Sequence, residues 1–109
     1  MKTATKKQIS WTNFLKFYSE QNKGRPTRLG VFDSGNDYWL EDGLILTGID
    51  FDTRRNVIEI MLSDEITHTI NDVKKVEASF SLDEINDGLD ITDFEGRITI
   101  LRFEEKIIG

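Results

Sequence analysis

The chain has 109 residues, a formal net charge of −6 at pH 7 and no cysteine. This length suits one domain whose core buries about two-thirds of the surface of the unfolded chain. The lack of cysteine excludes disulfides, thiolate metal sites and cysteine nucleophiles, and the acidic balance argues against general nucleic-acid binding, which needs a basic surface.

The charges are unevenly distributed along the chain. Residues 1–28 hold seven lysines and arginines against one acid, whereas residues 29–109 hold seven against nineteen acids. The basic segment can fold against the acidic body, stay solvated as a tail, or meet an anionic partner. No apolar run approaches the about 18 residues that span a bilayer, so we expect a cytoplasmic protein without membrane contact.

The first nine residues are polar and rich in lysine, without a periodic pattern. We therefore predict a flexible basic tail at residues 1–9, followed by one domain at residues 10–109. The sequence contains no internal repeat and no stretch with the composition of a linker.

A helix is predicted from Trp11 to Asn22, with Ser10 as its N-cap. Apolar residues recur at the spacing of one helical face: Trp11, Phe14, Leu15 and Tyr18. Such an aromatic stripe is more typical of a helix face that covers a sheet than of a ligand-stacking surface. Phe17 lies off this stripe and is a candidate for contact with a partner.

From Thr27 onward, short runs of β-branched and aromatic residues alternate with turn formers, which is typical of an antiparallel meander. The first predicted strand ends at the turn formers of residues 33–37, and residues 38–41 form the predicted return strand. Asp42 and Gly43 then fit the central positions of a type I′ hairpin turn.

Residues 44–62 form the predicted centre of the sheet, with two apolar runs on either side of a polar turn. Leu46 and Phe51 have opposite parity, and Gly48 lies between them. A glycine at such a change of phase indicates a bulge or bend that lets both halves of the strand face one core. The alternative is a straight strand covered on both faces.

Four further strands complete the pattern, with a helical turn predicted at residues 81–88; the strands are predicted at residues 66–70, 75–80, 89–93 and 97–103. Asp93 and Arg97 flank a short loop in which Gly96 can take a positive φ. The predicted fold class is α+β: an amphipathic helix packed on a bent antiparallel sheet of about six to eight short strands. The sheet is predicted to form a small barrel of the Sm or SH3 type or a compact sandwich.

His68 is the single histidine of the chain and the one candidate for catalysis. Ile66 and Ile70 share its parity on the predicted strand, so burial would influence its pKa. One interpretation is a general base in a shallow pocket, and the other is a partly buried histidine that is hydrogen-bonded locally. No Gly-x-Ser-x-Gly motif predicts a catalytic triad.

Acidic pairs and adjacent arginines offer weaker signals. Asp50 and Asp52 share a strand face and could hold a cation, but two oxygen donors are too few, which favours a solvated strand end. A calcium loop at residues 83–94 is excluded because its twelfth position is not an acid. Arg54 and Arg55 form either an anion clamp or a solvated hairpin tip. No metal or cofactor is predicted.

The order and spacing of a set of residues along the chain carry a family resemblance: Trp11, Phe14, Leu15, Ser19, Gly24, Leu46, Gly48, Ile49, Ile58, Ile60, Leu62, Asp64, Thr67, His68, Ile70, Leu89, Ile91, Gly96, Thr99, Leu101 and Phe103. In these residues the chain resembles a family of small bacterial proteins classed as a domain of unknown function. The resemblance covers roughly residues 10–103 and implies a bacterial, cytoplasmic, single-domain protein, without an activity that can be carried over.

The sequence thus favours a non-enzymatic binding or adaptor module that acts through contacts with a protein partner or as a homodimer. The candidate binding residues are Trp39, Phe17, Arg54 and Arg55. The alternative is a small enzyme or ligand-binding protein with a shallow site around His68.

Overall fold

The structure is a computed structural model that describes residues 5–80 and 86–104. In these residues it contains one helix and seven strands. The elements are α1 (Lys6–Asn22), β1 (Pro26–Asp33), β2 (Asn36–Asp52), β3 (Val57–Leu62), β4 (Ile66–Ile70), β5 (Val73–Phe80), β6 (Asn86–Asp93) and β7 (Ile98–Phe103).

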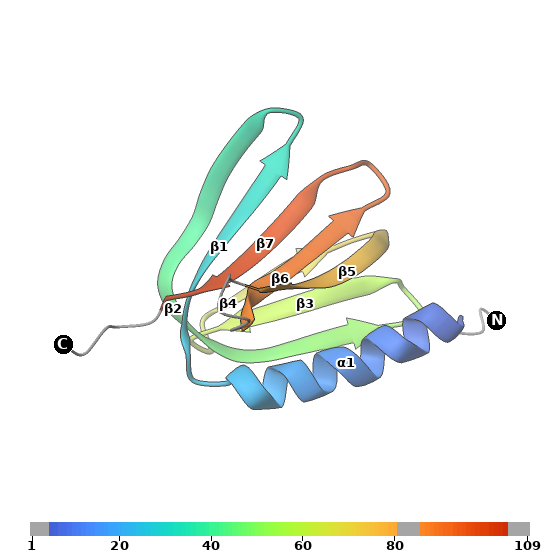
Figure 1. Cartoon of the computed structure of the whole chain (residues 1–109), viewed down its shortest axis with the longest axis horizontal. Helices are drawn as coiled ribbons and strands as arrows, with labels where there is room; N and C mark the ends of the chain where they lie inside the picture. The colour runs from blue at the N-terminus through green and yellow to red at the C-terminus, as the bar shows by residue number, and fades with distance from the viewer. Residues whose placement is uncertain (1–4, 81–85, 105–109) are drawn as a thin grey trace.

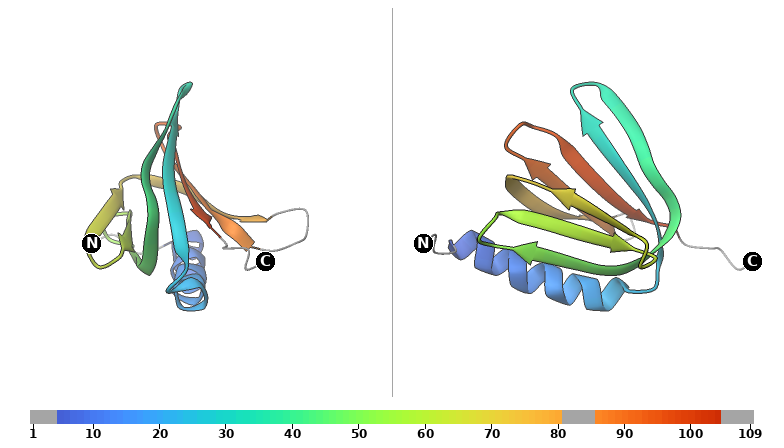
Figure 2. Two further views of the ribbon diagram at one scale, coloured as in Figure 1. Left: turned by 90° about the vertical axis from the view of Figure 1, so that its left-hand side faces the viewer. Right: turned by 180° about the vertical axis from the view of Figure 1, so that it is seen from behind.

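The seven strands form one antiparallel sheet in the order β4-β3-β2-β1-β7-β6-β5. The long strand β2 belongs to both halves of this sheet, because its first part pairs with β1 and its second part pairs with β3. The helix runs along β2, and the β1–β2 and β6–β7 hairpins fan out away from it (Figures 1 and 2). The predicted α+β fold, with one helix packed on a bent antiparallel sheet, is confirmed.

The sheet does not close, so of the two predicted forms, a small barrel or a compact sandwich, the barrel is wrong. The edge strands β4 and β5 follow each other in the chain through Asn71 and Asp72, but they do not pair. Instead, the Val73 amide donates to the Asn56 carbonyl at 3.4 Å, and the Phe94 amide donates to the Asp72 carbonyl at 3.0 Å. These bonds attach the link to two other turns, which satisfies its backbone without a β4–β5 ladder.

The helix begins earlier than predicted. Thr5 is the N-cap, and its hydroxyl accepts a hydrogen bond from the Gln8 amide at 3.1 Å while the Gln8 side chain accepts one from the Thr5 amide at 3.0 Å. This reciprocal capping box replaces the predicted cap at Ser10. Residues 6–9 of the predicted basic tail therefore belong to α1.

The aromatic stripe of α1 covers the sheet, as predicted. Leu15 and Tyr18 are buried, and the Trp11 ring lies 6.0 Å from the Phe51 ring between centroids. The Ile49 amide donates a hydrogen bond to the Ser19 hydroxyl at 3.0 Å, so the helix also satisfies the backbone of β2. In the described residues, α1 falls short of the length and apolarity that a membrane-spanning helix needs.

The two halves of the sheet enclose a shared core together with the helix. Its fully buried members come from α1 and from strands of both halves: Leu15, Leu29, Leu46, Ile58, Ile60, Leu62, Leu89, Ile91 and Leu101. The bend of β2 brings these side chains together, because each half alone buries only one face.

The predicted type I′ turn at Asp42 and Gly43 is wrong, because β2 continues through both residues. Gly43 has a positive φ of 86° and lies at a shift in the β1–β2 register, which marks a bulge. The tight turn of this hairpin lies instead at Ser34 and Gly35, which both have positive φ, within the predicted turn of residues 33–37.

The predicted irregularity near Gly48 is confirmed. The β2–β3 register shifts between Leu46 and Gly48, so that Leu46 and Phe51 both enter the core despite their opposite parity. The helical turn predicted at residues 81–88 falls partly on residues 81–85, outside the described residues, and partly on β6.

Candidate functional site

A cavity of about 340 Å³ lies on the inner side of the bent sheet. Strands from both halves of the sheet contribute to it, together with the β4–β5 link and the β6–β7 turn. Its lining residues are Val31, Tyr38, Leu40, His68, Thr69, Ile70, Asn71, Asp72, Asp93, Glu95, Arg97 and Thr99. A cavity of this size accommodates a small organic molecule.

The cavity has a buried floor and a more exposed rim. Val31, Ile70 and Thr99 are almost fully buried and supply apolar surface with one hydroxyl group. Tyr38 and Leu40 stand at the rim with about half and about a third of their surfaces exposed, at 48% and 37%. The polar groups around this apolar floor can fix the orientation of a small polar ligand.

His68 faces this cavity from β4. It pairs with the buried Ile60 of β3, which places its ring on the inner face, as its parity predicted. Burial lowers the pKa of His68 below its ordinary value of 6.5, while the Glu41 carboxylate raises this pKa to a smaller extent. The ring is therefore neutral at pH 7 and offers one hydrogen-bond donor and one acceptor.

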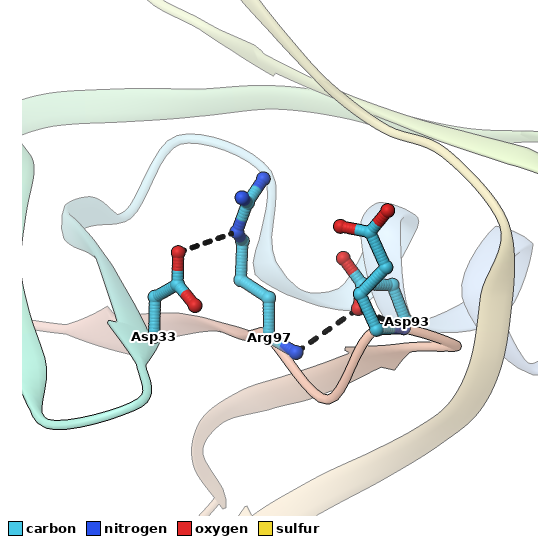
Figure 3. Close-up of polar contacts among 4 residues, drawn as sticks. Asp33, Asp93 and Arg97 are labelled. Carbon is cyan, nitrogen blue, oxygen red and sulfur yellow. Dashed lines mark hydrogen bonds and ion pairs between the residues drawn. The ribbon is translucent and has the colours of Figure 1, made fainter.

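The β6–β7 turn is fixed by Asp93. The Oδ1 atom of Asp93 accepts hydrogen bonds from the backbone amides of Glu95, at 2.9 Å, and Arg97, at 3.0 Å (Figure 3). The amide of Gly96, whose φ is +88°, donates to the Asp93 carbonyl at 3.1 Å. These bonds hold the turn in one conformation and so determine where the Arg97 side chain begins.

Arg97 extends from this turn toward the cavity. Its Nε atom lies 3.3 Å from Oδ2 of Asp33, and this carboxylate raises the pKa of Arg97, with smaller contributions from Asp93 and Tyr38. Figure 3 shows the two terminal nitrogens pointing away from Asp33. Within the described residues these nitrogens have no protein acceptor, so they are available to a ligand.

The four predicted binding residues are not brought together. Phe17 is 65% exposed on the outward side of α1. Arg54 and Arg55 lie in the β2–β3 turn, where their backbone amides donate to Oδ1 of Asp52. The Nη1 atom of Arg55 lies 3.9 Å from Oδ2 of Asp52. Asp52 thus stabilises this turn, as residues of this type often do.

Trp39 lies on the outer face of the sheet, away from His68. It pairs with Gly30, where a side chain would collide with its ring, and the Arg28 guanidinium lies 4.6 Å from the ring centroid. Outward-facing apolar side chains surround it on β1 and β7. We call this group the outer-face patch: Trp39, Phe32, Ile98 and Ile100.

The acidic pairs form no metal site: in the residues that the structure describes, no group of three or more possible ligands converges. Asp50 and Asp52 pair across the hairpin with Glu59 and Val57. A contact that the sequence did not suggest joins Asp42 and Glu104, whose shared hydrogen bond raises the pKa of Glu104.

The sequence pointed to His68 but did not indicate that Tyr38 and Arg97 line the same cavity. The sequence did predict a turn between Asp93 and Arg97 that contains Gly96, and this turn is the feature that could have placed Arg97 at a hairpin tip. That Arg97 and His68 line one cavity depends on the curvature of the sheet, which brings β4 opposite the β6–β7 hairpin.

Comparison with known proteins identifies no relative: no family model, no curated protein and no solved structure matches this chain. The resemblance to a family of small bacterial proteins therefore stays a prediction.

Proposed function

We propose that the protein is a non-enzymatic binding module that holds a small polar molecule in the cavity beside His68. One observation supports this most directly. A neutral imidazole and a guanidinium with two available nitrogens, from opposite halves of the sheet, line one cavity above an apolar floor. Such convergent polar groups fix the orientation of a ligand, while the floor contributes affinity.

Binding is favoured over catalysis by the surroundings of His68. A histidine base in nucleophilic catalysis is hydrogen-bonded to the nucleophile and is oriented by a third group. In the described part of the chain, the His68 ring makes no hydrogen bond to a hydroxyl or carboxylate. Glu41 influences its pKa by charge alone.

A thermal-shift experiment tests this function. The full chain is heated with a panel of small carboxylates, amines, amino acids, sugars and nucleosides. A ligand present at about 100 times its Kd adds about 2.7 kcal/mol to the stability, which raises the Tm by several degrees. We expect at least one class to do this for the parent protein and for the control Arg55→Gln, but much less for Arg97→Gln.

Two results would refute this function. In one, no compound shifts the Tm. In the other, Arg97→Gln and His68→Gln respond to every compound as the parent does, which would place binding elsewhere. Arg97 is exposed and its ion pair with Asp33 lies at the surface, so its replacement leaves the fold intact.

A second candidate function is self-association through the outer-face patch. Trp39 and Phe32 are 48% and 43% exposed there, at positions where a solvated sheet face normally carries polar residues. The neighbouring charges are already paired within the chain: Arg28 with Glu104 at 3.1 Å and Arg102 with Asp90 at 2.8 Å. A neutralised border around an apolar centre suits a second copy of this chain better than a highly charged partner.

Sedimentation velocity distinguishes this candidate. The parent protein should form a dimer that Trp39→Ser and Phe32→Ser weaken, whereas Phe17→Ser, which removes an exposed aromatic ring from α1, should leave it unchanged. A parent protein that is monomeric at all accessible concentrations would rule out self-association.

A further inference from the structure

The charges that line the cavity are unequal. Arg97 supplies the one lysine or arginine side chain among the described lining residues, whereas Asp72, Asp93 and Glu95 supply three carboxylates. Asp33 does not line the cavity, and its carboxylate forms an ion pair with Nε of Arg97. The cavity therefore has one cationic position in an acidic surround.

Both kinds of charge have unused bonding capacity. The terminal nitrogens of Arg97 point away from Asp33, and Figure 3 places Arg97 between Asp33 and Asp93. Asp93 uses Oδ1 for two backbone amides, and its Oδ2 accepts no hydrogen bond from the described residues. Asp72 and Glu95 are exposed and form no ion pair with a described residue.

A ligand with only one charge can pair either with Arg97 or with the carboxylates, but not with both. An isolated anion would bind Arg97 but would be repelled by the three carboxylates, and an isolated cation would bind the carboxylates but would be repelled by Arg97. A molecule that carries both charges a few bonds apart meets both requirements.

We propose, on the basis of the binding function above, that the ligand is a compact zwitterion of the amino-acid class. Its carboxylate binds the terminal nitrogens of Arg97 beside the Tyr38 hydroxyl, and its ammonium group faces Asp72 and Glu95. The apolar part of the ligand lies against Val31 and Ile70.

The arrangement gives each neighbouring residue a defined task. Arg97 is the charge that selects a carboxylate, because a guanidinium can donate two parallel hydrogen bonds to it. The carboxylates select the ammonium group. His68 is neutral and tolerates either charge, and its ring adds one donor or one acceptor.

Isothermal titration calorimetry with matched compounds tests the class of ligand. The full chain is titrated with L-leucine, with N-acetyl-L-leucine, which lacks the ammonium group, and with L-leucinamide, which lacks the carboxylate. Each derivative should bind about 10-fold or more weakly, the usual effect of losing a charge-assisted hydrogen bond. L-alanine and L-phenylalanine, each with the same two derivatives, extend the test to other side-chain sizes.

Two variants assign each charge to its partner. Arg97→Gln should remove the preference for the amino acid over its amide but retain the preference over its N-acetyl form. The double variant Asp72→Asn and Glu95→Gln should do the reverse. Arg55→Gln, in a turn outside the cavity, should leave both preferences unchanged.

The outcomes separate this inference from the proposed function. If an acetylated or amidated compound binds as well as its parent amino acid and Arg97→Gln weakens both, the cavity is a binding site but its ligand is not a zwitterion. If no amino acid binds while another class in the thermal-shift panel does, the inference also fails and the function stands. If no compound binds in either experiment, both fail.

Discussion

His68 lies on the inner side of β4, where its burial determines how the protein responds to acid. The charged groups that line the same space come from several elements: Asp72 in the β4–β5 link, Asp93 at the end of β6, and Glu95 and Arg97 in the β6–β7 turn. Glu41 on β2 acts on the His68 ring by its charge. Burial is the dominant influence and lowers the pKa of His68. The unfolded chain therefore binds this proton more readily than the folded chain.

We predict that His68 contributes stability that is fully present above its unfolded pKa of about 6.5 and is lost as the pH falls toward its folded pKa. Urea unfolding of the parent and of His68→Gln at about pH 7.5 and about pH 5.5 checks this. The variant should lose less stability between the two values than the parent. Equal losses would contradict the burial of the neutral ring.

Gly88 and Gly48 both lie in strands but differ in what a side chain would meet. At Gly88, a Cβ atom would collide with the backbone carbonyl of Leu101 on β7, whereas at Gly48 it would meet Cε of Met61 at 2.9 Å. The methionine end is flexible and can move, but the β7 backbone is held by its pairing on both sides.

Gly88→Ala should therefore lower the free energy of unfolding by about 1 to 3 kcal/mol, the usual effect of overpacking. Gly48→Ala should lower it by less. Chemical denaturation of the two variants under the same conditions measures the difference. A larger loss for Gly48→Ala would mean that its backbone, rather than Met61, restricts this position.

Among the elements, α1 begins at residues that the apolar pattern of the sequence does not mark as helical. Its first turn is polar apart from the exposed Ile9, so the apolar period becomes visible only at Trp11. The signal that was available is the spacing of Thr5 and Gln8, which forms the capping box. The spacing of apolar residues predicts only the part of a helix that is buried. The exposed first turn must be recognised from its N-cap residues.

Thr5→Ala should destabilise the protein by about 1 kcal/mol because it removes the N-cap. Ser10→Ala is the matched control, since Ser10 is exposed within the helix and alanine has the higher helix propensity. Thermal unfolding of both variants gives the comparison. A greater loss at Ser10 would restore the helix start that the sequence pattern suggests.

The strand β2 contains one irregularity that the local sequence predicts and one that it does not. The bulge at Gly48 could be predicted because the apolar positions change parity there. The bulge at Gly43 could not be predicted, because an Asp-Gly pair gives the same local signal in a hairpin turn and in a bulge. The outcome depends on cross-strand pairs such as Arg28 with Asp42 and Thr27 with Leu44, which keep both sides of Gly43 in one ladder.

For the molecule as a whole, most of the strands and the inner orientation of His68 were predictable, but the single long β2 and the candidate site were not. The site needs β4, at one edge of the sheet, to face the β6–β7 hairpin of the other half. This juxtaposition results from the bend of β2 and the short β4–β5 link. Neither the bend nor the link produces a local sequence pattern from which Arg97 or Tyr38 could be predicted to lie near the same cavity as His68.

The central claim is that the cavity between the two halves of the sheet receives a ligand. The most direct measurement is a set of intermolecular NOEs by NMR, recorded with the tightest-binding compound of the panels. The account predicts NOEs from the ligand to the His68 ring and to the methyl groups of Val31 and Ile70. NOEs confined to Trp39 and Phe32 on the outer face would contradict it.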